Sequence, residues 1–186
     1  MKPEKICHPF DPVFDENSRI LILGSLPSVA SREQNFYYGH PRNRFWKILA
    51  AMFDEAIPDS IEKKKQFLLR HRIALWDVIE SCMISGSSDA SIKEAVPNNL
   101  QEILDKASIA AVFCNGQTAA KLYHRYQEKQ TGLKGEVLPS SSPANAACSL
   151  EKLTEIWKEK IIPALGENLM KAADEAGKKE QSNEKE

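Results

Sequence analysis

Short apolar runs alternate with longer amphipathic segments along most of this 186-residue chain, and this alternation limits the possible folds most strongly. The first run, Arg19–Leu23 (RILIL), stops at Gly24, and two others are Ile73–Ile79 (IALWDVI) and Ile109–Cys114 (IAAVFC). Apolar runs of this length, bounded by turn-forming residues, are typical of strands buried on both faces. A fourth, shorter strand is predicted at Glu136–Leu138.

Helical periodicity fills the intervals between these strands. After Asn43, apolar residues from Phe45 to Phe53 recur at spacings of three and four, which predicts an amphipathic helix. Further helices are predicted at Ser60–His71, from Pro97 to about Lys106, at Gln117–Gln130 and at Leu150–Leu165, with residues 1–18 and 80–96 irregular. This order predicts an α/β fold: a three-layer αβα arrangement around a central four-stranded, mainly parallel sheet.

The composition is that of one globular domain, with 42% hydrophobic and 27% charged residues. We expect the domain to cover residues 1–166. Residues 167–186, rich in charge and poor in large apolar side chains, are expected to form a frayed or disordered tail. No apolar run approaches the roughly 18–20 residues of a membrane span, and the first ten residues have no signal-peptide core. We therefore expect a cytoplasmic protein, and a monomer because no apolar stripe stands apart from the core pattern.

Several kinds of site lack support in the sequence. The four cysteines, Cys7, Cys82, Cys114 and Cys148, form no CxxC pair, so we expect no metal site and no iron–sulfur cluster. Neither GxxxxGK[ST] nor GxGxxG occurs, so no nucleotide cofactor is expected. Cys114 has no nearby histidine that could activate it as a nucleophile. The net charge of -1 gives no bulk argument for nucleic-acid binding.

Three loops are expected to meet at one edge of the sheet. Gly24–Ser28 follows the first strand, Asn115–Gln117 the third, and Pro139–Asn145 the fourth. Ligands of open parallel sheets bind outside the carboxyl ends of the strands. Small residues there let backbone N–H groups approach anionic oxygens, which suits a phosphate-bearing ligand. Taken singly, each loop is also compatible with ordinary turn chemistry.

Five side chains near this edge have both a structural and a functional interpretation. Tyr38 lies in a loop where a base can stack on it. Asn43 is either a helix N-cap or an amide aimed into the site, and Asn115 is either a turn residue or a reader of a base edge. His40 is either an acid or base or a structural histidine. Asp77 is either a cap or a carboxylate of the site.

Three segments in order resemble the uracil-DNA glycosylase superfamily, across about residues 19–165. Gly24–Ser28 (GSLPS) is similar to its first motif, and His40–Trp46 (HPRNRFW) closely resembles a segment of the mismatch-specific uracil/thymine branch. Leu138–Asn145 resembles its second motif, a loop that enters the minor groove. Leu26 departs from the pattern, because the superfamily usually has a water-activating Asp, Asn or Glu there. With GSLP, YYGHPxNxFW and SSSPAN, the chain resembles the hypoxanthine-DNA (deoxyinosine) glycosylase branch.

This resemblance implies a role for each matching residue. Asn43 becomes the catalytic group that positions water, and Tyr38 the aromatic that stacks on the base. Asn115, Ser25 and Leu26 bind the base, and His40 supports the site. The DNA backbone and intercalation loop comprises Gly24, Ser140, Ser141, Ser142, Pro143, Ala144 and Asn145. Ala144 stands where relatives have a bulkier wedge.

The function implied is base-excision repair of DNA containing deaminated bases. We expect the protein to hydrolyse the N-glycosidic bond of deaminated bases, with hypoxanthine as the main substrate, and to leave an abasic site. Because no lysine stands out as a Schiff-base nucleophile, a monofunctional glycosylase without cofactor is expected. In a bacterial or archaeal cell it would be nucleoid-associated. The alternatives are a uracil or mismatch-specific glycosylase and a non-catalytic damaged-DNA-binding module of the same fold.

Overall fold

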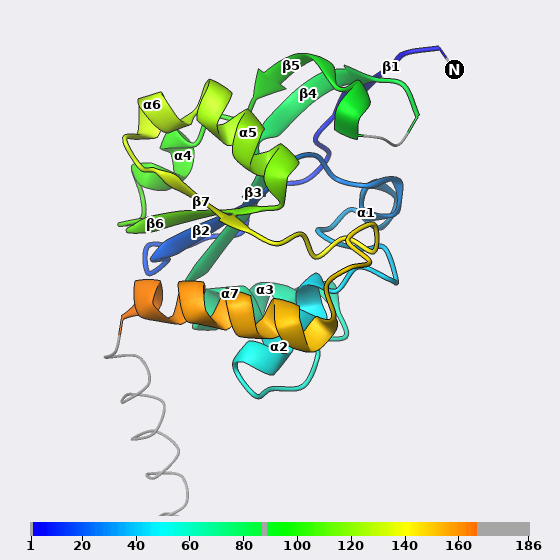
Figure 1. The fold of residues 1–186 in the computed structure, drawn as a ribbon. Helices are drawn as coiled ribbons and strands as arrows, with labels where there is room; N and C mark the ends of the chain where they lie inside the picture. The colour runs from blue at the N-terminus through cyan, green and yellow to red at the C-terminus, as the bar shows by residue number, and fades with distance from the viewer. Residues whose placement is uncertain (1, 87–88, 167–186) are drawn as a thin grey trace, which may run out of the picture.

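The larger of two sheets forms the centre of the computed structural model, which describes residues 2–86 and 89–166 (Figure 1). Its strands are β2 (Ile20–Gly24), β3 (Ile73–Asp77), β6 (Ala111–Asn115) and β7 (Gly135–Leu138). They lie in the order β3-β2-β6-β7, and every pair is parallel. The predicted four-stranded parallel sheet is thus confirmed. The tail predicted at residues 167–186 lies outside the described residues.

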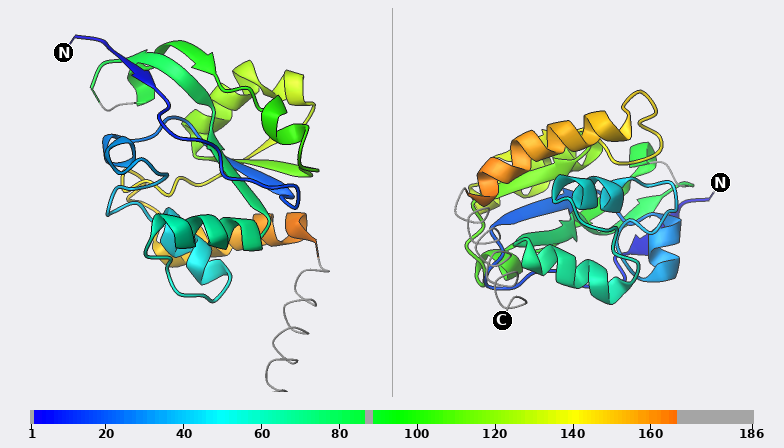
Figure 2. Two further views of the ribbon diagram at one scale, coloured as in Figure 1. Left: turned by 180° about the vertical axis from the view of Figure 1, so that it is seen from behind. Right: turned by 90° about the horizontal axis from the view of Figure 1, so that it is seen from below.

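Helices cover both faces of this sheet (Figures 1 and 2). One layer contains α2 (Phe45–Met52), α3 (Ile61–Arg70) and α7 (Leu150–Leu165), and the other contains α4 (Gln101–Leu104), α5 (Gln117–Tyr126) and α6 (Glu128–Thr131). Because both faces are covered, all five residues of β2 and of β3 are buried. The predicted three layers are confirmed. No helix in the described ranges combines the length and the apolar character needed to cross a bilayer.

A second sheet corrects the prediction that residues 1–18 and 80–96 are irregular. There β1 (Glu4–Cys7), β4 (Ile79–Ile84) and β5 (Lys93–Pro97) form an antiparallel sheet in the order β1-β4-β5. One residue of β1, three of β4 and none of β5 are buried, so no apolar run marks these strands in the sequence. The predicted strand Ile73–Ile79 is likewise divided between β3 and β4.

The predicted helix boundaries differ at three places. Pro97 ends β5 instead of opening a helix, and the Asn98 side chain there donates to the Asp77 carbonyl at 2.9 Å. The helix predicted at 117–130 is interrupted at Gln127, whose buried side chain donates to the Asn98 carbonyl at 2.8 Å. A helix that was not predicted, α1 (Val29–Gln34), is N-capped by Ser28. Tertiary hydrogen bonds at Asn98 and Gln127 thus override the local helical pattern.

The sheet register brings the predicted loops together. Gly24, the last residue of β2, lies opposite Asp77 of β3, and Asn115 of β6 lies opposite Leu138 of β7. The loops that follow these strands therefore start side by side at the same edge.

Candidate active site

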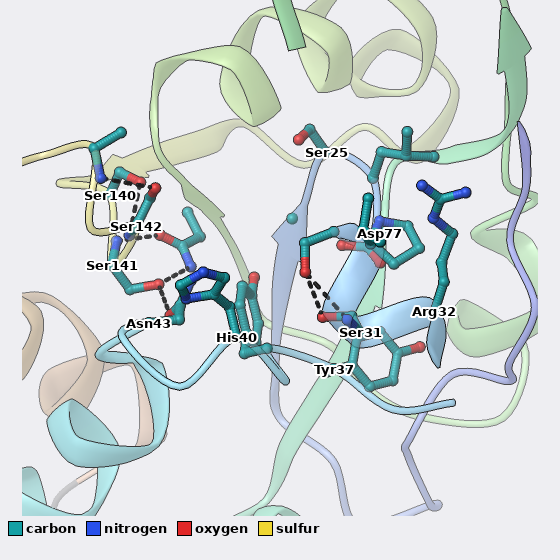
Figure 3. Close-up of a pocket in the computed structure, with 18 of the residues that line it drawn as sticks. Ser25, Ser31, Arg32, Tyr37, His40, Asn43, Asp77, Ser140, Ser141 and Ser142 are labelled. Carbon is teal, nitrogen blue, oxygen red and sulfur yellow. Dashed lines mark hydrogen bonds between the residues drawn. The ribbon is translucent and has the colours of Figure 1, made fainter. Parts of the chain in front are cut away.

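A pocket of about 530 Å³ opens at this edge of the sheet (Figure 3). The predicted site residues line it, with the exception of Asn145: Gly24, Ser25, Leu26, Tyr38, His40, Asn43, Asn115, Ser140, Ser141, Ser142, Pro143 and Ala144. Figure 3 shows two walls, with the serines, Asn43 and His40 on one side and Asp77, Ser31 and Arg32 on the other. The volume lies within the range of small-ligand sites.

A hydrogen-bonded chain joins three elements along the first wall. Asn115 Nδ2 donates to Ser141 Oγ at 2.9 Å, and Ser141 Oγ donates to Asn43 Oδ1 at 2.9 Å. The Ser141 backbone N–H donates in return to Asn115 Oδ1 at 3.0 Å. Ser141 is fully buried, so its hydroxyl is shielded from competing water. Its two bonds therefore fix how both amides face the pocket.

The orientation of the Asn43 amide follows from its partners. Oδ1 accepts from the Phe45 backbone N–H at 3.0 Å as well as from Ser141 Oγ. A rotated amide would place its NH₂ group against the Phe45 N–H, two donors facing each other. Nδ2 is therefore the free end, and it bonds to no residue of the described ranges. Asn43 thus presents a hydrogen-bond donor, Nδ2, to the pocket. Its Oδ1 at the same time accepts the backbone N–H of Phe45, the first residue of α2.

Arg44 holds the loop that follows β7, here called the serine loop after Ser140, Ser141 and Ser142. Its guanidinium donates to the backbone carbonyls of four loop residues: Ser141, Ser142, Asn145 and Cys148. Asn145 adds a bond from its own side chain to the Ser140 carbonyl at 3.0 Å. Asn145 thus lies behind the loop, where it stabilises the turn. No local pattern revealed this role for Arg44, because its partners lie about a hundred residues further along the chain.

Asp77 lies in the second wall, and its hydrogen-bond partner is His8, which does not itself line the pocket. His8 Nε2 lies 2.7 Å from Asp77 Oδ2, and both side chains are about 96–97% buried, with exposed fractions of 3% and 4%. A Cβ on Gly24 would lie 2.2 Å from Asp77 Oδ1, so only glycine fits beside this carboxylate. The structure therefore places Asp77 in the site. The sequence did not reveal His8, which lies in the N-terminal segment predicted to be irregular.

Tyr38 and His40 also line the pocket. The Tyr38 ring stacks on Phe45 at a centroid distance of 4.0 Å, and its backbone φ of 53° is in the left-handed region. His40 Nδ1 accepts the Arg42 backbone N–H at 3.1 Å. Nε2 is therefore the ring nitrogen that His40 has left for the pocket.

Arg32 is a further lining residue that the sequence analysis missed. Its Nε is buried, and it has no hydrogen-bond partner among the described residues. An arginine without a partner at a pocket is suited to an anionic group of a ligand. Its position in α1, a helix that was not predicted, explains why it was missed.

Other nucleophile and metal chemistry finds no support in these residues. Burial raises the pKa of the Cys114 thiol to about 12, so Cys114 is a core residue. Within the described ranges, no group of three or more His, Cys, Asp or Glu side chains could hold a metal ion.

Comparisons with known proteins agree with this architecture. The family model of the uracil DNA glycosylase superfamily matches residues 12–166. A hypoxanthine DNA glycosylase of Methanosarcina barkeri is 35% identical over 154 residues, which are 81% of this chain and 94% of the relative. A hypoxanthine DNA glycosylase of Methanosarcina acetivorans is 36% identical over 151 residues, or 80% and 94%. A solution NMR structure from Methanosarcina acetivorans, provisionally described as a uracil DNA glycosylase, superposes with a TM-score of 0.71 at 34% identity, covering 83% of this chain and 96% of that one.

Proposed function

Because this chain belongs to the uracil DNA glycosylase superfamily, we propose that it removes deaminated bases from DNA, with hypoxanthine as its main substrate. The reaction is hydrolysis of the N-glycosidic bond, which leaves an abasic site. Two relatives at 35% and 36% identity have the name hypoxanthine DNA glycosylase. The observation that carries the proposal is the Asn43 amide, fixed by Ser141 with its donor end free in the pocket.

The pocket suits a nucleotide that has left the double helix. An enzyme can reach a glycosidic bond inside duplex DNA only after the nucleotide is flipped out, at a cost of a few kcal/mol. Tyr38, Ser25 and Leu26 line the part of the pocket assigned to the base, and Asn115 keeps one amide N–H that is not used by Ser141. Stacking on Tyr38 and a hydrogen bond from Asn115 are the contacts we propose for the base.

The DNA backbone is proposed to lie against the serine loop. Hydroxyl and backbone N–H groups of this loop, together with those beside Gly24, form hydrogen bonds to phosphate oxygens. Arg32 adds a positive charge at the same pocket. The Arg44 bonds hold the loop in place before DNA arrives, which reduces the ordering cost of binding.

Asn43 contributes as a donor. As the glycosidic bond breaks, negative charge moves to the leaving base, and a water must reach the sugar carbon. An amide NH₂ group can hold the water oxygen or donate to the base, but it cannot remove a proton. Orientation and electrostatic stabilisation are the contributions left to it. Leu26 packs against the core and provides no polar group to orient water.

The enzyme is proposed to be monofunctional. Among the described residues that line the pocket there is no lysine, so no Schiff base with the sugar is available to begin strand cleavage. Its substrate lies in DNA, so in a bacterial or archaeal cell the protein would act at the nucleoid.

The test uses duplex oligonucleotides with one deoxyinosine or one deoxyuridine. We expect free hypoxanthine in the supernatant, and strand breaks only after alkali. Asn43→Ala is expected to lose most turnover while retaining its unfolding temperature. Breaks without alkali would refute the monofunctional mechanism, and faster release of uracil would make the protein a uracil or mismatch glycosylase. Tight binding to deoxyinosine DNA without release of a base would leave only a damaged-DNA-binding module.

A further inference from the structure

We propose that Asp77, held by His8, recognises the ring N–H that deamination creates, and thereby makes the pocket select deaminated bases. Asp77 is a specificity-determining residue in this proposal and His8 a positioning residue. The inference rests on the proposed function, because it concerns how the same pocket distinguishes its substrate from a normal base.

Deamination reverses one hydrogen-bonding position of the base ring. Adenine has a lone pair at N1, whereas hypoxanthine has N1–H beside its new carbonyl. Cytosine and uracil differ in the same way at N3. A hydrogen-bond acceptor fixed at this position therefore binds the deaminated base and repels the lone pair of the parent base.

Asp77 Oδ1 is such an acceptor. The carboxylate lines the pocket on the wall opposite Asn43, and its side chain is only 4% exposed (Figure 3). His8 binds Oδ2, while Oδ1 has no hydrogen bond to any residue in the described part of the chain. Oδ1 lies beside the backbone of Gly24, where a Cβ would approach it to 2.2 Å. A side chain at position 24 would therefore collide with Oδ1, and glycine leaves the room that the carboxylate needs.

The hydrogen bonds of His8 keep Oδ1 an acceptor. His8 Nδ1 lies 2.8 Å from the Phe10 carbonyl, which can only accept, so Nδ1 carries a proton. Nε2 then either donates to an ionised Asp77 or accepts from a protonated one. The proton lies between Nε2 and Oδ2 in both states, so Oδ1 is an acceptor in both. A buried carboxyl group without such a partner could carry its proton on either oxygen, and Oδ1 could then become a donor.

The burial of Asp77 suits the geometry of the base. The ring N–H of hypoxanthine points away from N9, the atom that joins the sugar, and N3–H of uracil points away from N1. A base that enters with its sugar at the mouth of the pocket presents this N–H inward, where the Asp77 side chain is only 4% exposed. Asn43 lies on the opposite side of the pocket from Asp77 (Figure 3), which leaves its donor available to another part of the same base.

The experiment compares two substrates in four proteins. Deoxyinosine has N1–H, whereas deoxynebularine, which carries unsubstituted purine, has a lone pair at N1. Single-turnover release of hypoxanthine and of purine is measured for the wild type, Asp77→Asn, Asp77→Leu and His8→Phe, and the readout is the ratio of the two rates. A merely structural defect lowers both rates together and leaves the ratio unchanged.

We expect Asp77→Leu to reduce this ratio by about 10- to 100-fold, the effect of losing one buried hydrogen bond to a charged group. Asp77→Asn should retain most of the ratio, because its NH₂ can donate to neutral His8 while its oxygen replaces Oδ1. His8→Phe, which keeps a ring beside Phe10 and Tyr37, should reduce the ratio less than Asp77→Leu does.

An unchanged ratio in folded Asp77→Leu would overturn the inference. If Asp77→Leu does not fold, a ratio in folded His8→Phe that equals the wild-type value would overturn it as well. Failure of the proposed function has a different signature, since the wild type itself would then release no base from either substrate.

Discussion

Replacing Ser141 by alanine tests the link between the serine loop and the Asn43 amide, the group proposed to act in catalysis. The hydroxyl of Ser141 accepts from Asn115 and donates to Asn43, both at 2.9 Å, and it is fully buried. Alanine removes both bonds and leaves two amide groups without these partners. At about 1–1.5 kcal/mol for each bond, the free energy of unfolding should fall by about 2–3 kcal/mol.

Two measurements follow from this loss. For a chain of this size, about 2–4 °C per kcal/mol corresponds to a decrease in unfolding temperature of about 4–12 °C. Asn43 keeps its bond to the Phe45 N–H but loses the bond that fixes its rotation. We therefore expect single-turnover release of hypoxanthine to slow by about 10- to 100-fold, somewhat less than for removal of a whole oriented donor.

Ser60→Ala is the matched control. The Ser60 hydroxyl caps α3, where it accepts from the Lys63 backbone N–H at 3.2 Å, and it does not line the pocket. Its loss should cost about 1 kcal/mol of stability and leave base release unchanged. If Ser141→Ala releases base at the wild-type rate despite a lower unfolding temperature, the hydroxyl does not orient Asn43 and the reasoning is refuted.

Three further predictions concern the loop, the DNA contact and the cysteines. Arg44→Lys should slow base release by at least about 10-fold, because an ammonium group cannot bond to all four loop carbonyls that the guanidinium holds. Wild-type kinetics in this variant would show that these bonds are not needed to position the loop. Arg32→Gln should weaken binding to all DNA sequences alike and lower the slope of log K against log salt by about one, whereas an unchanged slope would exclude a phosphate contact. At pH 8, iodoacetamide should alkylate the exposed Cys7 rapidly and Cys114 of the folded protein hardly at all, since burial raises the pKa of the Cys114 thiol to about 12. Mass spectrometry follows the alkylation of each cysteine with time, and equal rates at the two sites would contradict this prediction.

Most of the central sheet was predictable because three of its strands, β2, β3 and β6, are buried on both faces. Burial of this kind requires apolar side chains at every position, so β2, β3 and β6 appear in the sequence as short apolar runs. Parallel strands end at a common edge, and the loops after them were therefore assigned correctly to one rim. The second sheet was missed because its strands are partly exposed and because β1 pairs with β4, which lies far from it in the chain.

The roles of single side chains required the tertiary structure. His8 and Asp77 are 69 residues apart, and no local pattern connects the N-terminal segment with the end of β3. Arg44 appeared in a motif, but its partners are carbonyls of a loop about a hundred residues away. Contacts of this kind depend on how the chain packs, which local residue types do not encode.

Asn43 shows where the two sources of information divide. The sequence alone placed an asparagine at the start of a helix, beside a loop that resembles a glycosylase motif, and it left open a cap or a catalytic amide. Only the folded protein brings Ser141 to it, across 98 residues of chain. One oxygen then accepts from both the helix and the serine. Asn43 is not the N-cap itself, because it lies one residue before the N-cap Arg44, although its bond to the Phe45 N–H supports the start of α2. It is an oriented donor, because an amide held by its oxygen has only its NH₂ group left for the pocket.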